Sequence, residues 1–414
     1  MRRSIIVILA TLMAVVLPAS GMAATRTAKS NLSGTVTFWN TYSPDEIAAF
    51  QQKVIPAFEA KYPNIHINNL TLPYDGTFTK LITSIAGGTG PDVVRSDIIW
   101  VPQLANINGL ERLDKYSWFT SLKKSVFSGP LRTTFYRGHF YGLPLDTNTR
   151  VMFYSKSMFQ AAGISRAPAT TTEMLADCAK IKALGSGKYC YAEGGFGAWS
   201  IMPWVWSYGG NLTNNTFSKA SGYLNGKGTL AAVNFLLGMF HKGYLSPNIL
   251  GGGIGTWDGF GKNYAMILDG PWTVPFLFKN QYPSSDYGIS LVPKGPGGSH
   301  SVVGGEDIVM LKASRNKPAA AAFMQFMLSK QAQTMMGKVG QMPVLNSLAH
   351  SSAFPAYYPI FQKQLKTAKP RTPSPEWSKI DDTLTSKLDT VFHGNASPKD
   401  ALNSAARTVD GLLR

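Results

Sequence analysis

Carboxylates, a guanidinium group and aromatic rings lie in this sequence close to the ends of predicted strands. Asp97 follows an apolar pair, and Trp272 comes soon after an apolar run at 265–268. An ionised carboxylate accepts hydrogen bonds strongly, and an aromatic face offers apolar surface. Such groups together can hold a molecule that combines hydroxyl groups with apolar C–H faces. The candidate contacts are Trp39, Tyr42, Ser43, Tyr74, Asp97, Asp146, Arg150, Asp258, Trp272, Gly305 and Glu306.

The segment 141–156 carries two of these candidates. Residues 141–144 are an apolar run that ends in proline, as at the end of a strand that leaves a sheet, and residues 151–154 begin another run. Asp146 and Arg150 lie between the two runs. Polar residues between two apolar elements indicate a crossing between lobes that faces a shared cleft. An ordinary polar loop is the equally good alternative.

A strand–helix corner at 34–46 carries three more. The alternating β-formers of 34–39 predict a strand, and Ser43-Pro44-Asp45-Glu46 is a capping box with proline at the first helical position. In α/β proteins such corners direct free backbone amides towards ligands. Trp39, Tyr42 and Ser43 are therefore expected in the cleft, although Trp39 can also be a core residue.

Two later segments combine a predicted strand with polar or flexible residues. Ala265–Leu268 predicts a buried strand that leads to Trp272, for which a place in the core is the less favoured alternative. Gly304-Gly305 allows close approach of the backbone to a ligand, and Glu306 can accept from hydroxyl groups.

Length and pattern give the fold class. The chain has 414 residues, of which 44% are hydrophobic, enough for a large core in two or more lobes. Strand patterns at 34–39, 65–68 and 93–94 alternate with helix patterns at 47–58 and 78–85. This alternation predicts an α/β fold with crossover helices.

Residues 1–24 have the pattern of a secretory signal peptide. Arg2-Arg3 precede the apolar segment Ile5–Leu17, and small residues at 21–24 form a cleavage site. The apolar segment is too short to span a bilayer comfortably, and no cysteine follows the cleavage region. We therefore expect a soluble, exported, periplasmic protein without a lipid anchor.

The net charge of +17 raises nucleic acid and membrane surfaces as partners. The Lys and Arg residues are scattered, however, and no basic stripe alternates with aromatic residues. Solvated surface charge is the better interpretation, so no nucleic-acid partner is expected.

The two cysteines, Cys178 and Cys190, are predicted to lie in an oxidising compartment, where a pair can form a disulfide. The pattern before Cys190 is helical and the pattern around it is that of a strand. A bridge would join a helix to the next strand. Two buried free thiols are the alternative.

Enzyme motifs have little support in the sequence. None of the six histidines has the spacing of a metal ligand, and no Gly-x-Ser-x-Gly, Walker or zinc motif is present, so we expect neither catalysis nor a cofactor. A glycoside hydrolase is the enzyme alternative, because acid pairs can be assembled from Asp97, Asp146, Asp258 and Glu306.

Short motifs along nearly the whole mature chain resemble family 1 extracellular solute-binding proteins, the sugar-capturing components of ABC importers. No single motif is specific for this family, but the order and spacing of the motifs are. Tyr154-Ser155-Lys156 is a minor departure from the Tyr-Asn-Lys of many relatives. The motifs are Phe38-Trp39, Phe58-Glu59, Gly90-Pro91-Asp92, Tyr141-Gly142-Leu143-Pro144, Tyr154-Ser155-Lys156, Ala162-Gly163, Gly209-Gly210, Ala265-Met266, Gly270-Pro271-Trp272 and Gly304-Gly305.

The resemblance implies two α/β lobes joined by three crossings around a central ligand cleft. It places an N-terminal lobe at 34–145 plus 304–350 and a C-terminal lobe at 146–303 plus 351–414. It also implies that Trp199 stacks on a sugar and that Arg371 contacts the ligand, with surface packing the alternative for Arg371. The implied partners are a small-molecule sugar and the permease subunits of an ABC transporter, for a protein expected to be monomeric.

These observations together predict capture of a neutral sugar, such as a disaccharide or small oligosaccharide. The expected cleft holds more carboxylates than guanidinium groups, which favours a ligand rich in hydroxyl donors. A receptor for an anionic polyol such as glycerol 3-phosphate is the alternative within binding proteins.

Overall fold

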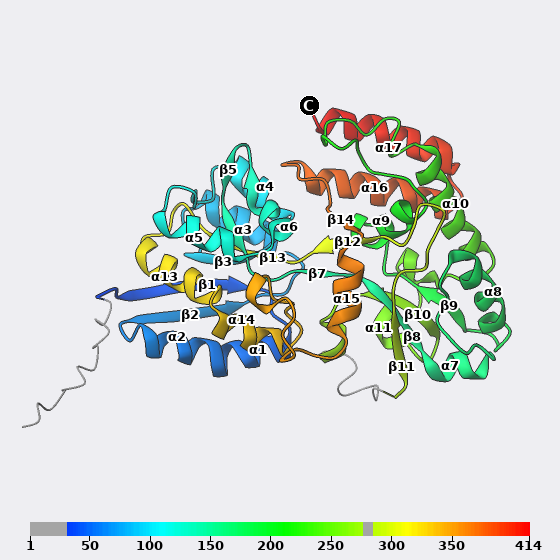
Figure 1. Cartoon of the computed structure of the whole chain (residues 1–414). Coiled ribbons are helices and arrows are strands. Elements are labelled where there is room, and N and C mark those ends of the chain that lie inside the picture. The colour runs from blue at the N-terminus through cyan, green and yellow to red at the C-terminus, as the bar shows by residue number, and fades with distance from the viewer. Residues whose placement is uncertain (1–30, 276–284) are drawn as a thin grey trace, which may run out of the picture. The chain divides into compact units, whose positions relative to one another are not determined.

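The computed structural model describes residues 31–275 and 285–414. In this part of the chain a five-stranded sheet has the order β2-β1-β3-β13-β6 (Figure 1). β1 is parallel to β2 and β3, whereas β13 is antiparallel to β3 and β6. The strands of this first sheet are β1 (Gly34–Asn40), β2 (Ile65–Thr71), β3 (Val93–Asp97), β6 (Gly142–Pro144) and β13 (Glu306–Met310).

Helices cover both faces of the first sheet. Neighbouring side chains of a strand point to opposite faces, and here both faces carry apolar side chains that pack against helices. Phe38 packs with Phe50 and Phe323 in one buried cluster, whereas Trp39 packs with Leu81 and Trp100 in another. The first face is covered by α1 (Pro44–Ala49), η1 (Phe50–Val54), α2 (Ile55–Lys61) and α13 (Lys317–Met327), and the second by α3 (Thr77–Ala86) and α4 (Trp100–Asn106).

A second sheet has the order β11-β8-β10-β9. β10 is antiparallel to β8 and parallel to β9, and every residue of β10 is buried. Its largest core cluster includes Trp204 and Trp206, together with residues of the long C-terminal helices. The strands are β8 (Val151–Ser155), β9 (Tyr189–Ala192), β10 (Tyr264–Asp269) and β11 (Tyr287–Ser290).

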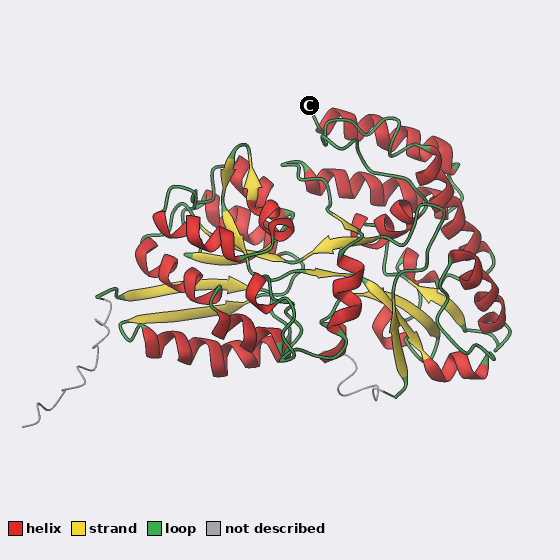
Figure 2. Ribbon diagram, in the orientation of Figure 1, coloured by secondary structure: helices red, strands yellow, loops and turns green. Residues whose placement is uncertain are grey.

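Three short strands form a separate small sheet, in the order β14-β12-β7. β7 (Asn148–Thr149) joins the first sheet to the second, and β12 (Ser301–Gly304) leads back from the second sheet to β13. β14 (Ala368–Lys369) precedes the C-terminal helices. The expected α/β class with two separate sheets is thus confirmed, and Figure 2 shows the mixture of helices and strands.

Other elements complete the described chain. They are α5 (Ser117–Ser125), α6 (Ser128–Leu131), η2 (Arg132–Thr134), β4 (Phe135–Tyr136), β5 (His139–Phe140), α7 (Lys156–Ala161), α8 (Thr171–Lys182), α9 (Ala198–Ser207), α10 (Lys227–His241), η3 (Pro247–Leu250), α11 (Thr256–Gly259), α14 (Lys330–Gly337), η5 (Asn346–Leu348), α15 (Tyr358–Leu365), α16 (Trp377–Phe392) and α17 (Pro398–Leu412).

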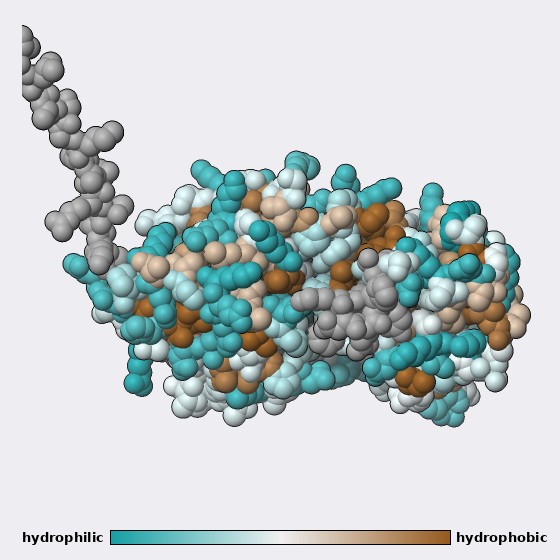
Figure 3. Space-filling view, turned by 90° about the horizontal axis from the view of Figure 1, so that it is seen from below, coloured by the Kyte–Doolittle hydropathy of each residue, from teal (hydrophilic) through white to brown (hydrophobic). Residues whose placement is uncertain are grey.

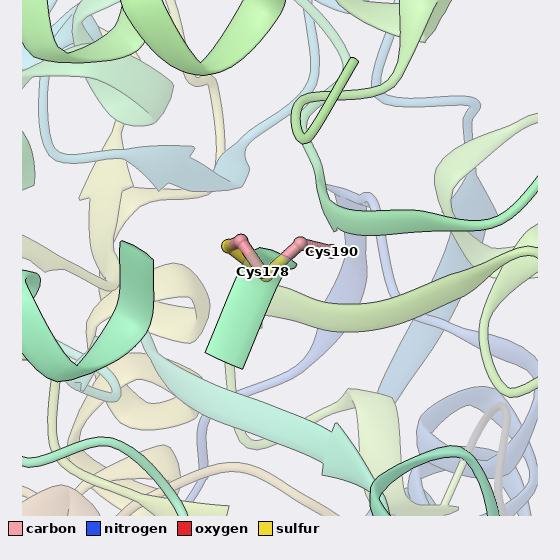
Figure 4. The surroundings of a disulfide bond; sticks show 2 residues. All are labelled: Cys178 and Cys190. Atoms are coloured by element: carbon pink, nitrogen blue, oxygen red, sulfur yellow. A yellow bond between two sulfur atoms is a disulfide. The ribbon is translucent and has the colours of Figure 1, made fainter. Parts of the chain in front are cut away.

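A disulfide joins Cys178 of α8 to Cys190 of β9 (Figure 4). Both residues are fully buried in the core cluster of the second sheet. The predicted link between a helix and the next strand is therefore confirmed.

The predicted signal peptide, residues 1–24, lies outside the described residues. Within 31–275 and 285–414, no helix has the length and apolar character needed to cross a bilayer. Figure 3 shows hydrophilic and hydrophobic residues interspersed over one face of the molecule.

Candidate functional site

Arg95, in the buried strand β3, is the centre of an ion-pair cluster. Its Nη2 lies 2.8 Å from Glu306 Oε2 and 3.5 Å from Asp146 Oδ2. Its Nη1 donates to Thr41 Oγ1 at 2.9 Å, and the guanidinium lies over the ring of Tyr42, 4.9 Å from its centroid. One cation thus links the corner after β1, the segment before β7 and the start of β13.

Backbone contacts bring the two carboxyl groups to the same guanidinium. The amides of Leu145 and Asp146 donate to the carbonyl of Glu306, at 2.7 and 3.2 Å. Gly305 has φ +130°, and a Cβ there would lie 2.5 Å from the carbonyl oxygen of Asp146. Gly305 therefore serves the close approach of two protein segments. Gly305 is buried, and its predicted contact with a ligand stays a prediction.

Burial sets the protonation of these carboxyl groups. It raises the pKa of Glu306 well above its ordinary value and also raises the pKa of Asp146, while the Arg95 charge opposes both shifts. The single positive charge of Arg95 does not compensate for burying two negative charges beside it. Asp146 and Glu306 therefore share one proton more readily than they both ionise.

A second ion pair joins Asp97, at the end of β3, to Arg371, which follows β14. Arg371 Nη2 donates to Asp97 Oδ1 at 3.2 Å, and the hydroxyl of Tyr74 donates to Asp97 Oδ2 at 2.8 Å. The ring of Tyr74 packs on Trp100 and leaves 49% of the residue exposed. The structure thus brings three predicted contacts together, with an accessible aromatic surface beside them.

Trp199 and Trp272 form a stacked pair, with ring centroids 6.0 Å apart and planes inclined by 27°. Trp199 begins α9 and Trp272 follows β10, and both are partly exposed. The guanidinium of Arg371 lies 5.4 Å from the centroid of Trp199, and that of Arg150 lies 5.8 Å from it. We call this pair of rings the tryptophan platform.

Two glycines make room for the platform. A Cβ on Gly304 would lie 2.7 Å from the ring of Trp199 and closer still to the Asn148 side chain. A Cβ on Gly270 would overlap the ring of Trp272. The glycines of the Gly304-Gly305 and Gly270-Pro271-Trp272 motifs thus place indole rings against the backbone, because only a residue without a Cβ leaves that space.

Arg150 supports the platform from below the surface. It is 3% exposed; Nη1 donates to the carbonyl of Trp199 at 3.0 Å and Nη2 to Glu193 Oε1 at 3.0 Å. A further bond reaches the carbonyl of Leu268. We expected Arg150 to bond ligand hydroxyl groups, but Nη1 and Nη2 already bond protein acceptors, so its observed role is to hold the start of α9 against β10.

The corner after β1 is more buried than we expected. Trp39 is 7% exposed and packs in the apolar cluster beneath α3 and α4, with Lys80 Nζ 5.1 Å from its ring centroid. Tyr42 packs on the opposite face of the sheet. Ser43 precedes α1, where its amide donates to Glu46 Oε2 at 2.8 Å. Trp39 is therefore a core residue, which was the alternative given above. Neighbouring side chains of a strand point to opposite faces, so its ring lies on the face covered by α3 and α4, away from Phe38.

Asp258 lies elsewhere. It is exposed in the first turn of α11, and no hydrogen bond or ion pair within the described chain joins it to the other candidates. Its neighbour Trp257 instead donates to Asp269 Oδ2 at 2.6 Å. The structure therefore does not bring Asp258 together with the other predicted contacts.

Three residues that the candidate set lacked are central to these clusters. Arg95 stands only two positions before Asp97, Glu193 pairs with Arg150, and Gln341 connects Arg95 to Glu46. A charged residue inside an apolar strand is the signal for Arg95. Glu193 carries no such signal, because its partner Arg150 comes from a distant segment.

Several buried polar atoms around these clusters lack a hydrogen-bond partner among the described residues. They are Tyr42 Oη, Asn148 Oδ1 and the Nε atoms of Arg95, Arg150 and Arg371. All lie in or beside strand ends and the segments of the small sheet. Buried polar atoms without partners are rare in folded proteins and require an explanation such as a functional role, so they mark this region as the candidate site.

The chain is similar to known binding proteins over most of its length. A galactooligosaccharide-binding protein of Bacillus subtilis is 25% identical over 376 residues, covering 87% of this chain and 86% of its own. A binding protein of Brucella abortus is 29% identical over 381 residues, covering 88% of this chain and 89% of its own.

Solved structures share the fold. The GacH receptor of Streptomyces glaucescens, studied unliganded and with acarbose, superposes with a TM-score of 0.83 at 22% identity, covering 92% of this chain and 99% of its own. The sugar-binding protein MalE of Xanthomonas citri superposes with a TM-score of 0.78 at 25% identity, covering 92% and 97%. The two-lobed binding-protein fold is thus shown. The model of the bacterial extracellular solute-binding protein family matches residues 40–334, and the chain belongs to that family.

Proposed function

We propose that the protein captures a sugar on the tryptophan platform and delivers it to the permease of an ABC importer. The observation that carries this proposal is the stacked, partly exposed pair of Trp199 and Trp272, with Arg371 beside it. Sugar rings present apolar C–H faces, which pack on aromatic rings while their hydroxyl groups stay available for hydrogen bonds.

The charges around the platform favour a neutral sugar. Arg150 pairs with Glu193, and Arg371 pairs with Asp97. Arg95 has both Asp146 and Glu306. Each guanidinium group thus has an acidic partner, so none of the three is free to neutralise an anion. The names of the Bacillus subtilis and Xanthomonas citri relatives also support sugar capture over an anionic polyol.

Capture requires the lobes to respond to the ligand. We place the N-terminal lobe at 34–145 plus 304–350 and the C-terminal lobe at 146–303 plus 351–414, as expected from the sequence. A ligand that contacts both lobes favours the state in which those contacts form, and only this difference in affinity shifts the equilibrium. In this proposal the protein is an exported, periplasmic monomer that binds no nucleic acid.

We also propose that the protein is not a hydrolase. The carboxyl groups of Asp146 and Glu306 lie beside one guanidinium, with side chains 3% and 14% exposed. A glycosidase needs two carboxyl groups that flank a bound glycosidic bond.

A thermal-shift screen of the purified mature protein against mono- and disaccharides tests the proposal. A sugar that binds only the folded state raises the melting temperature by mass action. We expect at least one neutral sugar to do so and to remain chemically unchanged. If no sugar shifts the melting temperature, or if the protein cleaves a disaccharide, the proposal is wrong.

A further inference from the structure

A recess of about 190 Å³ shares Arg371 with the tryptophan platform. Three pieces of chain form it: α9, the loop that follows α9, and the stretch from Lys369 at the end of β14 to Trp377 at the start of α16. The lining residues that matter here are Met202, Trp206, Asn211, Lys369, Arg371 and Trp377.

The helix α9 connects the platform to the recess. Trp199, Met202 and Trp206 are spaced i, i+3 and i+7, which places them along one face of a helix. Seven residues of α-helix span about 10 Å, so the recess lies within reach of a ligand on Trp199. Met202, Trp206 and Trp377 are at most 3% exposed, and they give the recess an apolar floor.

The walls of the recess are preorganised. Trp206 Nε1 donates to Asn211 Oδ1 at 2.7 Å, and Asn214 Oδ1 accepts from the amide of Ser218 at 2.8 Å. Phe217 in the same loop has φ +56°, a left-handed conformation that non-glycine residues rarely adopt. A loop held by its own hydrogen bonds needs little ordering on binding, which favours affinity.

The charged groups that line the recess are Lys369 and Arg371, and none of the lining residues is acidic. Lys369 is half-buried, and within the described chain no carboxylate pairs with it. Burial lowers the pKa of its ammonium group accordingly. Arg371 uses one Nη for Asp97, and its Nε is buried without a partner. A cation partly removed from water and without a counter-ion is unfavourable, and an anion would relieve that cost.

We propose that this recess is a second subsite that binds an anionic group at Lys369. The group is the carboxylate, sulfate or phosphate of an acidic sugar whose ring lies on the platform, or a small free anion. The first source rests on the proposed function, because it needs a sugar on Trp199 and Trp272. The second source does not.

Matched pairs of probes test the subsite at low ionic strength: galactose with galacturonate, and glucose with glucuronate. Inorganic phosphate and sulfate, each without sugar, form the third arm. Dissociation constants are measured by calorimetry for the wild type and for Lys369→Met, which removes the charge and keeps an apolar chain. The exposed Lys366, which does not line the recess, supplies the control variant Lys366→Met.

For the acidic-sugar source, we expect an acidic probe to bind about three- to tenfold more tightly than its neutral partner. Lys369→Met should abolish this difference, and Lys366→Met should preserve it. For the free-anion source, phosphate or sulfate should bind the wild type and Lys366→Met but not Lys369→Met. Provided that Lys369→Met melts like the wild type, the subsite is refuted if this substitution changes the dissociation constant of no acidic probe and no inorganic anion. If no neutral sugar binds but phosphate binds in a manner that depends on Lys369, only the proposed role of the tryptophan platform is refuted.

Discussion

At the scale of single residues, the site contains arginine side chains that form ion pairs with carboxylates of the protein itself. Arg95 is 5% exposed and has acidic partners from two crossings, while Arg150 and Arg371 each hold one carboxylate. Burying an ion pair costs most of the Coulomb energy it returns, so these pairs add little to stability. Removing one partner, however, leaves a buried charge and is costly. The pairs therefore fix geometry, and the aromatic rings beside them provide the binding surface.

Trp272→Ala should weaken sugar binding at least about tenfold, because the loss of one aromatic face is worth on the order of 1–3 kcal/mol. Calorimetry with the best sugar from the thermal-shift screen measures the effect. Trp118→Ala is the matched control: Trp118 is also partly exposed and stacks on a neighbouring ring, Tyr116, but lies in α5. Wild-type affinity in a folded Trp272→Ala protein would mean that this ring is only a core residue.

Gly304→Ala should lower both stability and sugar affinity. The added methyl group would lie 2.7 Å from the ring of Trp199, so the ring or the backbone must move. Overpacking of this kind typically costs about 1–3 kcal/mol. Gly238→Ala in the middle of α10 is the control, because a Cβ there meets no atom within 4 Å. This control should be neutral or slightly stabilising. Denaturant unfolding and calorimetry give both quantities, and an unchanged Gly304→Ala protein would contradict the packing argument.

Residue patterns could identify part of this site and not the rest. Trp272 follows a buried strand, Asp97 ends one and Glu306 begins one, and the apolar runs in the sequence reveal where these strands lie. Trp39 has the same signal, yet its side chain points to the face covered by α3 and α4. Period-2 alternation gives two faces but does not say which of them a helix covers. The pairing of Arg150, which precedes β8, with Glu193, which follows β9, depends on how these strands are ordered in the second sheet, and no local pattern contains that order.

At the scale of elements, local signals were strong enough to predict the α/β class. Proline and a capping residue start α1 and α17, and glycines end several helices. The small sheet β14-β12-β7 was not predictable in the same way. Its strands have two to four residues each. In the sequence, β12 comes about 150 residues after β7 and β14 about 220 residues after β7, so only tertiary structure brings the three together.

The disulfide between α8 and β9 should stabilise the second sheet. Its two cysteines are 12 positions apart, and the chain-entropy model gives about 2–3 kcal/mol for a loop of this length. Reduction should therefore lower the melting temperature. Denatured but unreduced mature protein should contain no titratable thiol, whereas two thiols before reduction would show that the bridge does not form. Cys178→Ala/Cys190→Ala, compared with wild type under reducing conditions, separates the bridge from the packing of the side chains.

At the scale of the whole molecule, the Arg95 cluster couples stability to pH. Burial raises the pKa of Glu306 and of Asp146, so the folded state binds more protons than the unfolded state above the ordinary carboxyl pKa. The stability that this pair contributes is thus complete below the unfolded pKa and is lost as pH rises towards the folded pKa. The free energy of unfolding should fall as pH increases from about 4.5, and Asp307, whose pKa burial also raises well above its ordinary value, should add to this fall.

Glu306→Gln should reduce this pH dependence, because Gln cannot ionise and still fills the site. Urea unfolding at pH 5 and pH 8 measures the difference for each variant. Glu376→Gln is the control, since Glu376 forms an ion pair with Lys379 near the surface. If wild type and Glu306→Gln respond equally to pH, the carboxyl groups near Arg95 do not share a proton in the folded protein.

The net charge of +17 makes salt dependence the decisive test of ligand class for the whole molecule. A basic protein attracts anions over a distance, and salt screens that attraction within about 8–10 Å at physiological ionic strength. The guanidinium groups of Arg150 and Arg371 beside the platform are already paired with Glu193 and Asp97, and a neutral sugar there presents no charge to screen. We therefore expect its dissociation constant to change little between low and physiological ionic strength. An acidic sugar that reaches Lys369 should lose affinity over the same range. Calorimetry with galactose and galacturonate in a salt series measures both, and a steep salt dependence for the neutral sugar would contradict the proposed role of the tryptophan platform.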